Sequence, residues 1–160
     1  MGATPKPRNL KGVWSHDSDE WATPDDLFNR LNSEFHFNLD ACATSDNTKC
    51  DDFFTKKQNG LAQSWAGRRV WCNPPYGRAV GDFVKKAFLE TGGGLSTICV
   101  CLVAARTDTA WWQDYAMRAS EIRLIRGRLK FGGAINGAPF PSALLIFGTP
   151  NYPRFTTMEV

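Results

Sequence analysis

The sequence has no apolar run that approaches the roughly 18 residues needed to span a membrane, so no membrane partner is expected. Its N-terminus lacks the apolar stretch of a secretory signal peptide, which predicts a protein that stays in the cytoplasm. Histidine is scarce, with two residues, and no cysteine pair has C-x-x-C spacing. Structural zinc sites use closely spaced ligand pairs, and we therefore expect no metal.

The cysteines that are present suit a cytosolic protein. There are five, an odd number: Cys42, Cys50, Cys72, Cys99 and Cys101. Disulfides are rare in reducing compartments, and a free cysteine behaves as a small apolar side chain that is usually buried. We predict reduced, mostly buried thiols and no thiol nucleophile.

Length and composition predict one globular domain. The chain has 160 residues, 42% of them apolar and 22% charged, which is enough for a single core. Residues 1–18 contain Gly, Pro, Lys and Ser with little apolar content, so we interpret them as a flexible tail and 19–160 as the domain. The net charge of +3 permits nucleic-acid binding without indicating it.

Helix-like and strand-like segments alternate along the chain, which is typical of an α/β sheet with crossover connections. Thr23 is predicted as the N-cap, and Pro24 as a first-turn residue, of a helix that ends near Phe35. Predicted strands cover 35–40, 68–72, 96–105, 121–131 and 142–149, and further helices cover 79–90 and 108–120. The last two strands are close in sequence, so we expect them to pair antiparallel at one edge of the sheet.

Polar residues follow three of the predicted strands. Asp40 ends the first, Asn73 ends the second, and Arg106 begins the polar loop after the third. In an open α/β sheet, ligands bind outside the carboxyl ends of the strands. The sequence therefore predicts a site assembled at this edge from distant segments.

The stretch Asn73-Pro74-Pro75-Tyr76 has two interpretations. One is a plain turn, because Asn-Pro and Pro-Pro are common turn markers. The other is a binding loop, in which the Asn73 side-chain oxygen and the Pro74 carbonyl accept hydrogen bonds from an amine on a planar ring, and Tyr76 stacks on that ring. An apolar strand before it and a helix behind it favour the binding loop.

Several segments in order resemble the phage and prophage DNA N6-adenine methyltransferases (Dam-type), which depend on S-adenosylmethionine. They are "WATP", "FNLDACAT", "KCDDFF", "NGLAQSW", "VWCNPPYG", "AARTDTAWW", "EIRLIRGRLKFGG" and "APFPSALLIF", and they span residues 21–148. The resemblance implies a compact Rossmann-like class I methyltransferase sheet flanked by helices. It also implies a bacterial host cell as the location and double-stranded DNA as the partner, and leaves the oligomeric state open.

The resemblance assigns two groups of site residues. The catalytic group is Asn73, Pro74, Pro75 and Tyr76, with Tyr76 stacked on a flipped adenine. The residues implied to hold S-adenosylmethionine are Thr23, Pro24, Asp40, Ala41, Cys42, Asn59, Gly60 and Leu61, with either Asp51 or Asp52 at the ribose hydroxyls. The chain departs from the superfamily pattern in one respect, because "LDACATSDN" has no glycine where a glycine-rich loop usually follows the first strand.

Two further segments are assigned to DNA. The predicted contacts are Arg106, Thr107, Trp111, Arg126, Arg128 and Lys130, and one of Trp111 and Trp112 is expected to pack while the other faces DNA. A solvated strand face is the plain alternative for the basic cluster after residue 122. Alternatives for the whole chain are a methyltransferase acting on cytosine N4, an RNA guanine or a protein glutamine, or a degenerate methyltransferase fold that only binds nucleic acid.

Overall fold

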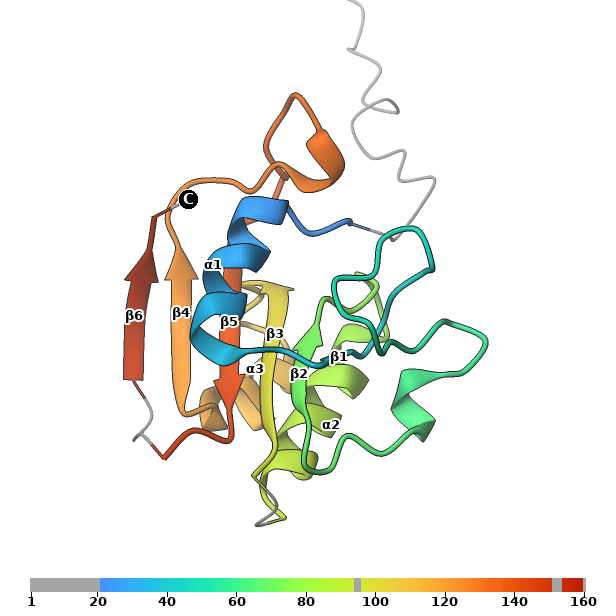
Figure 1. Ribbon diagram of the computed structural model, residues 1–160. Coiled ribbons are helices and arrows are strands. Elements are labelled where there is room, and N and C mark those ends of the chain that lie inside the picture. The colour runs from blue at the N-terminus through green and yellow to red at the C-terminus, as the bar shows by residue number, and fades with distance from the viewer. Residues whose placement is uncertain (1–20, 94–95, 151–153, 160) are drawn as a thin grey trace, which may run out of the picture.

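The computed structural model describes residues 21–93, 96–150 and 154–159 (Figure 1). The predicted flexible tail, residues 1–18, lies outside the described residues. The helices are α1 (Asp25–Phe35), α2 (Val80–Thr91) and α3 (Ala110–Asp114), and the 3₁₀ turns are η2 (Gly60–Ala62), η3 (Ala116–Arg118) and η4 (Phe131–Gly133). The strands are β1 (Leu39–Asp40), β2 (Arg69–Cys72), β3 (Ile98–Ala104), β4 (Glu121–Ile125), β5 (Ser142–Phe147) and β6 (Arg154–Met158).

The strands of the described chain form one six-stranded sheet in the order β1-β2-β3-β5-β4-β6. Pairing is parallel from β1 to β3 and between β4 and β6, while β5 runs antiparallel to both β3 and β4. The carboxyl ends of β1, β2, β3, β4 and β6 therefore share one edge of the sheet, and β5 begins at that edge (Figure 1). The predicted α/β sheet is confirmed.

Helices cover both faces of the sheet, and each face has its own apolar core. Leu27, Phe28, Leu31 and Phe35 of α1 pack on one face, against Trp71, Val100 and Leu144 among others. On the other face α2 contributes Val80, Phe83, Val84 and Ala87, and α3 contributes Trp112. β3 carries buried residues on both faces, as expected for a central strand.

The start of α1 differs from the prediction. Pro24 holds the N-cap position, no side chain caps the helix there, and Thr23 lies one residue earlier. The apolar spacing of the helix was predicted correctly, but the strand at 35–40 was not. Phe35 ends the helix, His36 adopts a left-handed conformation, and only Leu39–Asp40 pairs in the sheet.

The C-terminal strands also differ from the prediction. β4 ends at Ile125, so the basic residues at 126, 128 and 130 lie on a connecting loop and not on a strand face. β4 and β5 do pair antiparallel, yet they are not the edge of the sheet, because β6 adds to the outer side of β4. Residues of β6 were not predicted as a strand, although Phe155, Thr156 and Thr157 all favour extended backbone.

No helix in the described ranges is long and apolar enough to cross a bilayer.

Candidate active site

A cavity of about 560 Å³ opens at the carboxyl ends of β1 and β2. Its walls come from three segments that are far apart in the sequence: residues 21–23, the loops between 40 and 60, and the stretch from Trp71 to Phe83. This volume falls within the range of small-molecule and cofactor sites. The predicted strand-end residues Asp40 and Asn73 both line it.

Asp40 places a carboxylate at the base of the cavity with little contact with water. The residue is 3% exposed, and its side chain accepts hydrogen bonds from the backbone N–H groups of Cys42 (3.3 Å) and Lys49 (3.0 Å). Burial raises the pKa of Asp40 from 3.8 to about 6, and the two N–H groups counteract this shift only in part. A ligand cation at this position would supply the charge that the buried carboxylate lacks.

The amide of Asn73 has its orientation set by two acceptors. Its Nδ2 donates to the backbone carbonyl of Trp21 and to Thr23 Oγ1, the latter at 3.1 Å. A carbonyl oxygen only accepts, so the NH2 group must face Trp21. Asn73 Oδ1 is consequently turned away from both, and in the described structure this buried oxygen has no hydrogen-bond partner.

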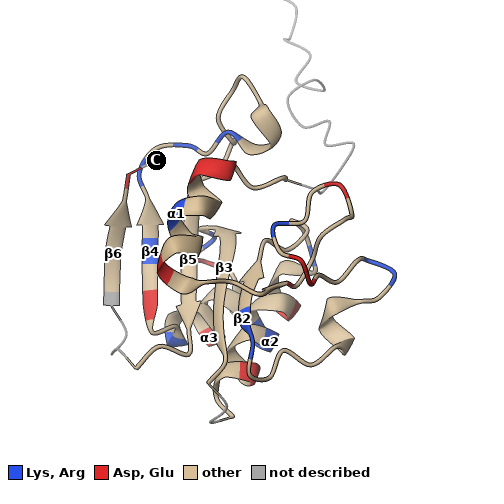
Figure 2. Ribbon diagram, viewed as in Figure 1, with Lys and Arg blue, Asp and Glu red and all other residues tan. Residues whose placement is uncertain are grey.

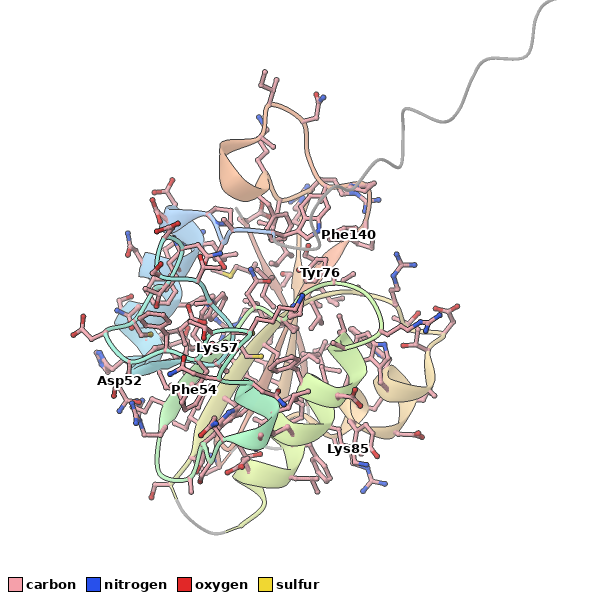
Figure 3. The ribbon with its side chains drawn as sticks, turned by 90° about the vertical axis from the view of Figure 1, so that its right-hand side faces the viewer. Asp52, Phe54, Lys57, Tyr76, Lys85 and Phe140 are labelled. Atoms are coloured by element: carbon pink, nitrogen blue, oxygen red, sulfur yellow. The ribbon has the colours of Figure 1, made fainter. Side chains whose placement is uncertain are left out.

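Tyr76 belongs to an aromatic cluster beside the cavity. Its ring is 6.2 Å from that of Trp21 at an interplanar angle of 27°, and the rings of Phe131 and Phe140 meet it edge-on at 5.9 and 5.1 Å. Figure 3 shows Tyr76 and Phe140 together below the loop that joins β4 to β5. Burial raises the pKa of Tyr76, so the phenol stays protonated at physiological pH. The ring is thus packed in the structure and also lines the cavity.

Three buried side-chain polar atoms lack a hydrogen-bond partner in the described ranges: Asn73 Oδ1, Tyr76 Oη and Ser142 Oγ. All three lie at the carboxyl edge, because Asn73 and Tyr76 follow β2 and Ser142 begins the antiparallel strand β5. Buried polar groups are normally satisfied, and of these three residues Asn73 and Tyr76 line the cavity.

Asn59 and Gly60 also line the cavity. Gly60 lies against the end of β1, where an added Cβ would come within 2.1 Å of the Ala41 carbonyl oxygen. Asn59 adopts a left-handed conformation and its side chain accepts from the Leu61 N–H. Among the predicted cofactor residues, Ala41, Cys42 and Thr23 also line the cavity, whereas Pro24 and Leu61 do not.

Asp51 and Asp52 lie outside the cavity, contrary to the expected ribose contact of one of them. Both are exposed, and Asp52 Oδ2 pairs with Arg68 Nη2 at 2.6 Å. Figure 3 shows Asp52 at the periphery, apart from Tyr76. The residue that bridges to Asp40 is Phe53, so the two aspartates precede the next sheet segment and do not follow it.

All five cysteines are free thiols, and Cys42 alone among them lines the cavity. Its Sγ lies 3.8 Å from that of Cys72, and burial raises the pKa of the Cys42 thiol. A neutral, buried thiol is a poor nucleophile. No group of three or more His, Cys, Asp or Glu residues within the described ranges is placed to hold a metal ion.

Comparison with known proteins identifies the family. A profile described as DNA N-6-adenine-methyltransferase (Dam) matches residues 12–150. The chain belongs to this family. It is 37% identical over 108 residues to the DNA N-6-adenine-methyltransferase of Haemophilus phage HP1, and 33% identical over 128 residues to that of Escherichia phage T1. A putative methyltransferase of Escherichia coli K12, YfdM, is 38% identical over 65 residues.

These matches cover different shares of each chain. The phage HP1 alignment covers 66% of this chain and 61% of the relative, and the phage T1 alignment covers 76% and 52%. The YfdM alignment covers 36% of this chain and 71% of that protein. The chain thus spans between half and two thirds of the length of the two phage relatives.

The residues predicted to contact DNA lie mostly on two loops at the carboxyl edge. Arg106 and Thr107 follow β3, while Arg126, Arg128 and Lys130 follow β4; all five are exposed. Figure 2 shows basic segments in the loop after β4 and acidic ones at the start of α1. Arg126 pairs with Glu159 at 2.9 Å, so it is partly neutralised.

Trp111 and Arg123 both make contacts within the domain, Trp111 by packing and Arg123 by ion pairs. Trp111 is half-buried on α3, with its ring 5.7 Å from that of Trp112 and its side chain against Gly81 of α2. Trp112 is buried in the core. Arg123 is not a solvated residue, because it pairs with Glu34 of α1 and with the buried Glu121.

Among the cavity residues that sequence reasoning did not assign, two contact the predicted site residues directly. Trp21 contributes a carbonyl to Asn73 and a ring to Tyr76, and Lys49 lines the cavity beside Asp40. Trp21 stands in the quoted segment "WATP", so its position was available. Lys49 is a single lysine in a polar stretch, and no pattern in the sequence distinguishes it from Lys56 or Lys57.

Proposed function

We propose that this protein transfers a methyl group from S-adenosylmethionine to the N6 amine of adenine in DNA. The observation that carries the proposal is Asn73, whose amide nitrogen is occupied while its buried oxygen lacks a partner. The family match and the DNA N-6-adenine-methyltransferases of two phages support the reaction and the substrate. The sheet, with five parallel strands and β5 reversed, fits the Rossmann-like class I architecture that this reaction would use.

The cavity fits the proposed methyl donor. The amino-acid end of S-adenosylmethionine carries an ammonium group that Asp40 can neutralise, and Asn59 and Gly60 line the part of the cavity that would take its adenine. When bound, S-adenosylmethionine supplies a methyl group already activated by the sulfonium. The protein therefore needs no covalent intermediate and acts by binding and positioning.

Asn73 would hold the target amine in the orientation needed for transfer. Asn73 Oδ1 and the Pro74 carbonyl accept hydrogen bonds from the two N6 hydrogens. With both hydrogens held, the nitrogen lone pair would face the methyl group. As the N–C bond forms, the methyl–sulfur bond would break to give S-adenosylhomocysteine, and one N–H proton would then pass to solvent water. A neutral amide performs this task without a shifted pKa.

The target adenine would have to leave the duplex to reach Asn73. Extrusion of a base costs a few kcal/mol, and stacking on an aromatic ring returns roughly 1–3 kcal/mol per base. We propose that Tyr76 provides this ring. Since Tyr76 now packs among Trp21, Phe131 and Phe140, the base would enter by displacing part of that cluster.

Methylation of DNA by the purified protein tests the proposal directly. The protein is incubated with labelled S-adenosylmethionine and mixed-sequence duplex DNA, which is then digested to nucleosides. We expect label in N6-methyladenine, loss of that label in Asn73→Ala, and no loss in Asn29→Ala, an exposed substitution on α1.

Each other outcome points to a named alternative. Label in N4-methylcytosine, RNA or protein would keep the Asn73 chemistry and replace the substrate. Cofactor binding without label on any pool would refute the reaction. Neither label nor cofactor binding would favour a module that binds nucleic acid only.

A further inference from the structure

Lys49 lines the cavity and also forms an ion pair with a residue outside it. Its side chain is only 17% exposed, and its backbone N–H donates to Asp40 Oδ2 at 3.0 Å. Its ammonium group binds the carboxylate of Asp25, the first residue of α1, whose side chain is 81% exposed. The lysine thus lies beside the one buried carboxylate of the cavity and is held by a carboxylate from outside it.

A ligand with a free α-amino-acid end needs two opposite charges close together. Its ammonium group needs an anion, and its carboxylate needs a cation; a group left without its counter-charge in a partly dry site is costly. Asp40 supplies the anion. Two lysines line the cavity, Lys49 and Lys56. Lys56 is exposed, whereas the backbone N–H of Lys49 donates a hydrogen bond directly to the Asp40 carboxylate.

We propose that Lys49 binds the α-carboxylate of the methyl donor by exchanging its partner Asp25 for the ligand. This inference rests on the proposed use of S-adenosylmethionine. Asp25 loses little on release, because its exposed carboxylate is readily hydrated. Asp25 is therefore a competitor for Lys49 and keeps the lysine next to the cavity until the ligand arrives.

The exchange also links two walls of the cavity. The Asp25–Lys49 pair joins the start of α1 to the loop that follows β1. The segment directly before α1 carries Thr23 and the Trp21 carbonyl, which hold Asn73. Occupation of Lys49 by the ligand frees the start of α1 beside the residues that orient the catalytic amide.

Calorimetric titration of two ligands with the full chain tests the assignment without measuring activity. The ligands are S-adenosylmethionine and decarboxylated S-adenosylmethionine, which lacks only the carboxylate. We expect Lys49→Met to weaken binding of the first by about tenfold to a hundredfold, the range of a charge-assisted hydrogen bond, and to leave binding of the second unchanged. Lys49→Arg should keep part of the discrimination.

Two matched controls separate this role from general charge and stability effects. Lys57→Met removes an exposed positive charge nearby and should change neither affinity. Asp25→Asn should tighten S-adenosylmethionine binding by a small factor, because the competitor is gone, while Asp26→Asn should not. A loss of binding in Lys49→Met that is equal for both ligands would indicate misfolding or a structural role and overturn the proposal.

The remaining outcomes are also decisive. If the unsubstituted protein binds S-adenosylmethionine and Lys49→Met binds it equally well, the Lys49 assignment is wrong and the proposed function stands. If Asp25→Asn weakens binding, the ion pair supports the site and the exchange is refuted. If the unsubstituted protein binds neither ligand, the proposed cofactor and this inference both fail.

Discussion

Thr23 Oγ1 accepts a hydrogen bond from Asn73 Nδ2 at 3.1 Å, joining residues 50 positions apart in the sequence. Thr23 is buried, and the backbone carbonyl of Trp21 binds the same nitrogen. Together they fix the orientation of the Asn73 amide, with Oδ1 turned away from both. Two residues ahead of the first helix therefore orient the Asn73 amide, and Thr23 makes this contact in place of the predicted helix cap.

Removing the Thr23 hydroxyl should slow methyl transfer more than it weakens binding. Thr23→Val keeps the shape of the side chain but leaves Asn73 Nδ2 with one acceptor, so the amide can turn. We expect kcat to fall about fivefold to tenfold, the worth of one hydrogen bond, with little change in KM for DNA. Thr23→Ser restores the acceptor and should restore kcat. An equal loss in both variants would mean that packing, and not the hydroxyl, matters.

Asp40 should make the stability of the ligand-free protein depend on pH between about 4 and 6. Its pKa is raised from 3.8 to about 6, so in this window the folded state binds more protons than the unfolded state. Stability from this group is present below pH 4 and is lost as pH rises through 6, by on the order of 3 kcal/mol.

Urea unfolding of the unsubstituted protein and Asp40→Asn across pH 4 to 7 measures this effect. As pH rises, the unfolding free energy of the unsubstituted protein should fall relative to that of the variant, because asparagine does not ionise. The substitution also disturbs the hydrogen bonds that Asp40 accepts from Lys49 N–H and Cys42 N–H. Because it disturbs them at every pH, they do not account for a change of this free-energy difference with pH. Parallel pH profiles would contradict the burial effect.

Affinity for S-adenosylmethionine should fall on acidification for the same reason. Below pH 6 the Asp40 carboxylate becomes protonated, and the ligand ammonium loses its counter-charge. We expect constant affinity near neutrality and a decline of up to about tenfold per pH unit below the midpoint. Calorimetry between pH 5 and 7 tests this, and a ligand without the amino group, 5′-methylthioadenosine, should show no such decline.

The exposed arginines at the carboxyl edge should contribute to DNA affinity through phosphate contacts. Arg106→Ala and Arg128→Ala are each expected to weaken binding and to reduce the slope of log K against log salt by about one. Lys85→Ala, an exposed substitution on α2 (Figure 3), should leave the slope unchanged. Fluorescence anisotropy over a range of salt concentrations gives both values, and unchanged affinity and slope in both arginine variants would remove this surface from the DNA interface.

The placement of polar residues at the ends of two strands was predictable, because each apolar run and the polar residue after it are adjacent in the sequence. An apolar run followed by Asn73-Pro74-Pro75-Tyr76, and another that reaches Asp40, place polar groups at one edge of any parallel sheet. The structure brings both residues into one cavity. Their roles in catalysis and cofactor binding stay predictions.

Other features depended on contacts that a sequence pattern does not carry. Asp51 and Asp52 directly precede Phe53, which pairs with Asp40. The sequence does not show which of these neighbouring residues pairs with β1, and this pairing determines where the two aspartate side chains lie. Arg123 looks like a solvated residue until Glu34, 89 positions earlier, is found beside it. The Asn73 side-chain oxygen was predicted as the acceptor, but the orientation of the amide follows only from its contacts with Trp21 and Thr23.

The reversed direction of β5 has a consequence for how this protein can change. Because β5 runs against β4, the loop between them leaves the sheet and re-enters it at the edge where Asn73 lies. A surface loop of this kind tolerates insertion and substitution without moving the strands that flank it. If the proposed function holds, residues 126–141 are free to change with the DNA sequence recognised while the cavity at β1 and β2 stays constant, so target preference and methyl transfer would evolve independently on one sheet.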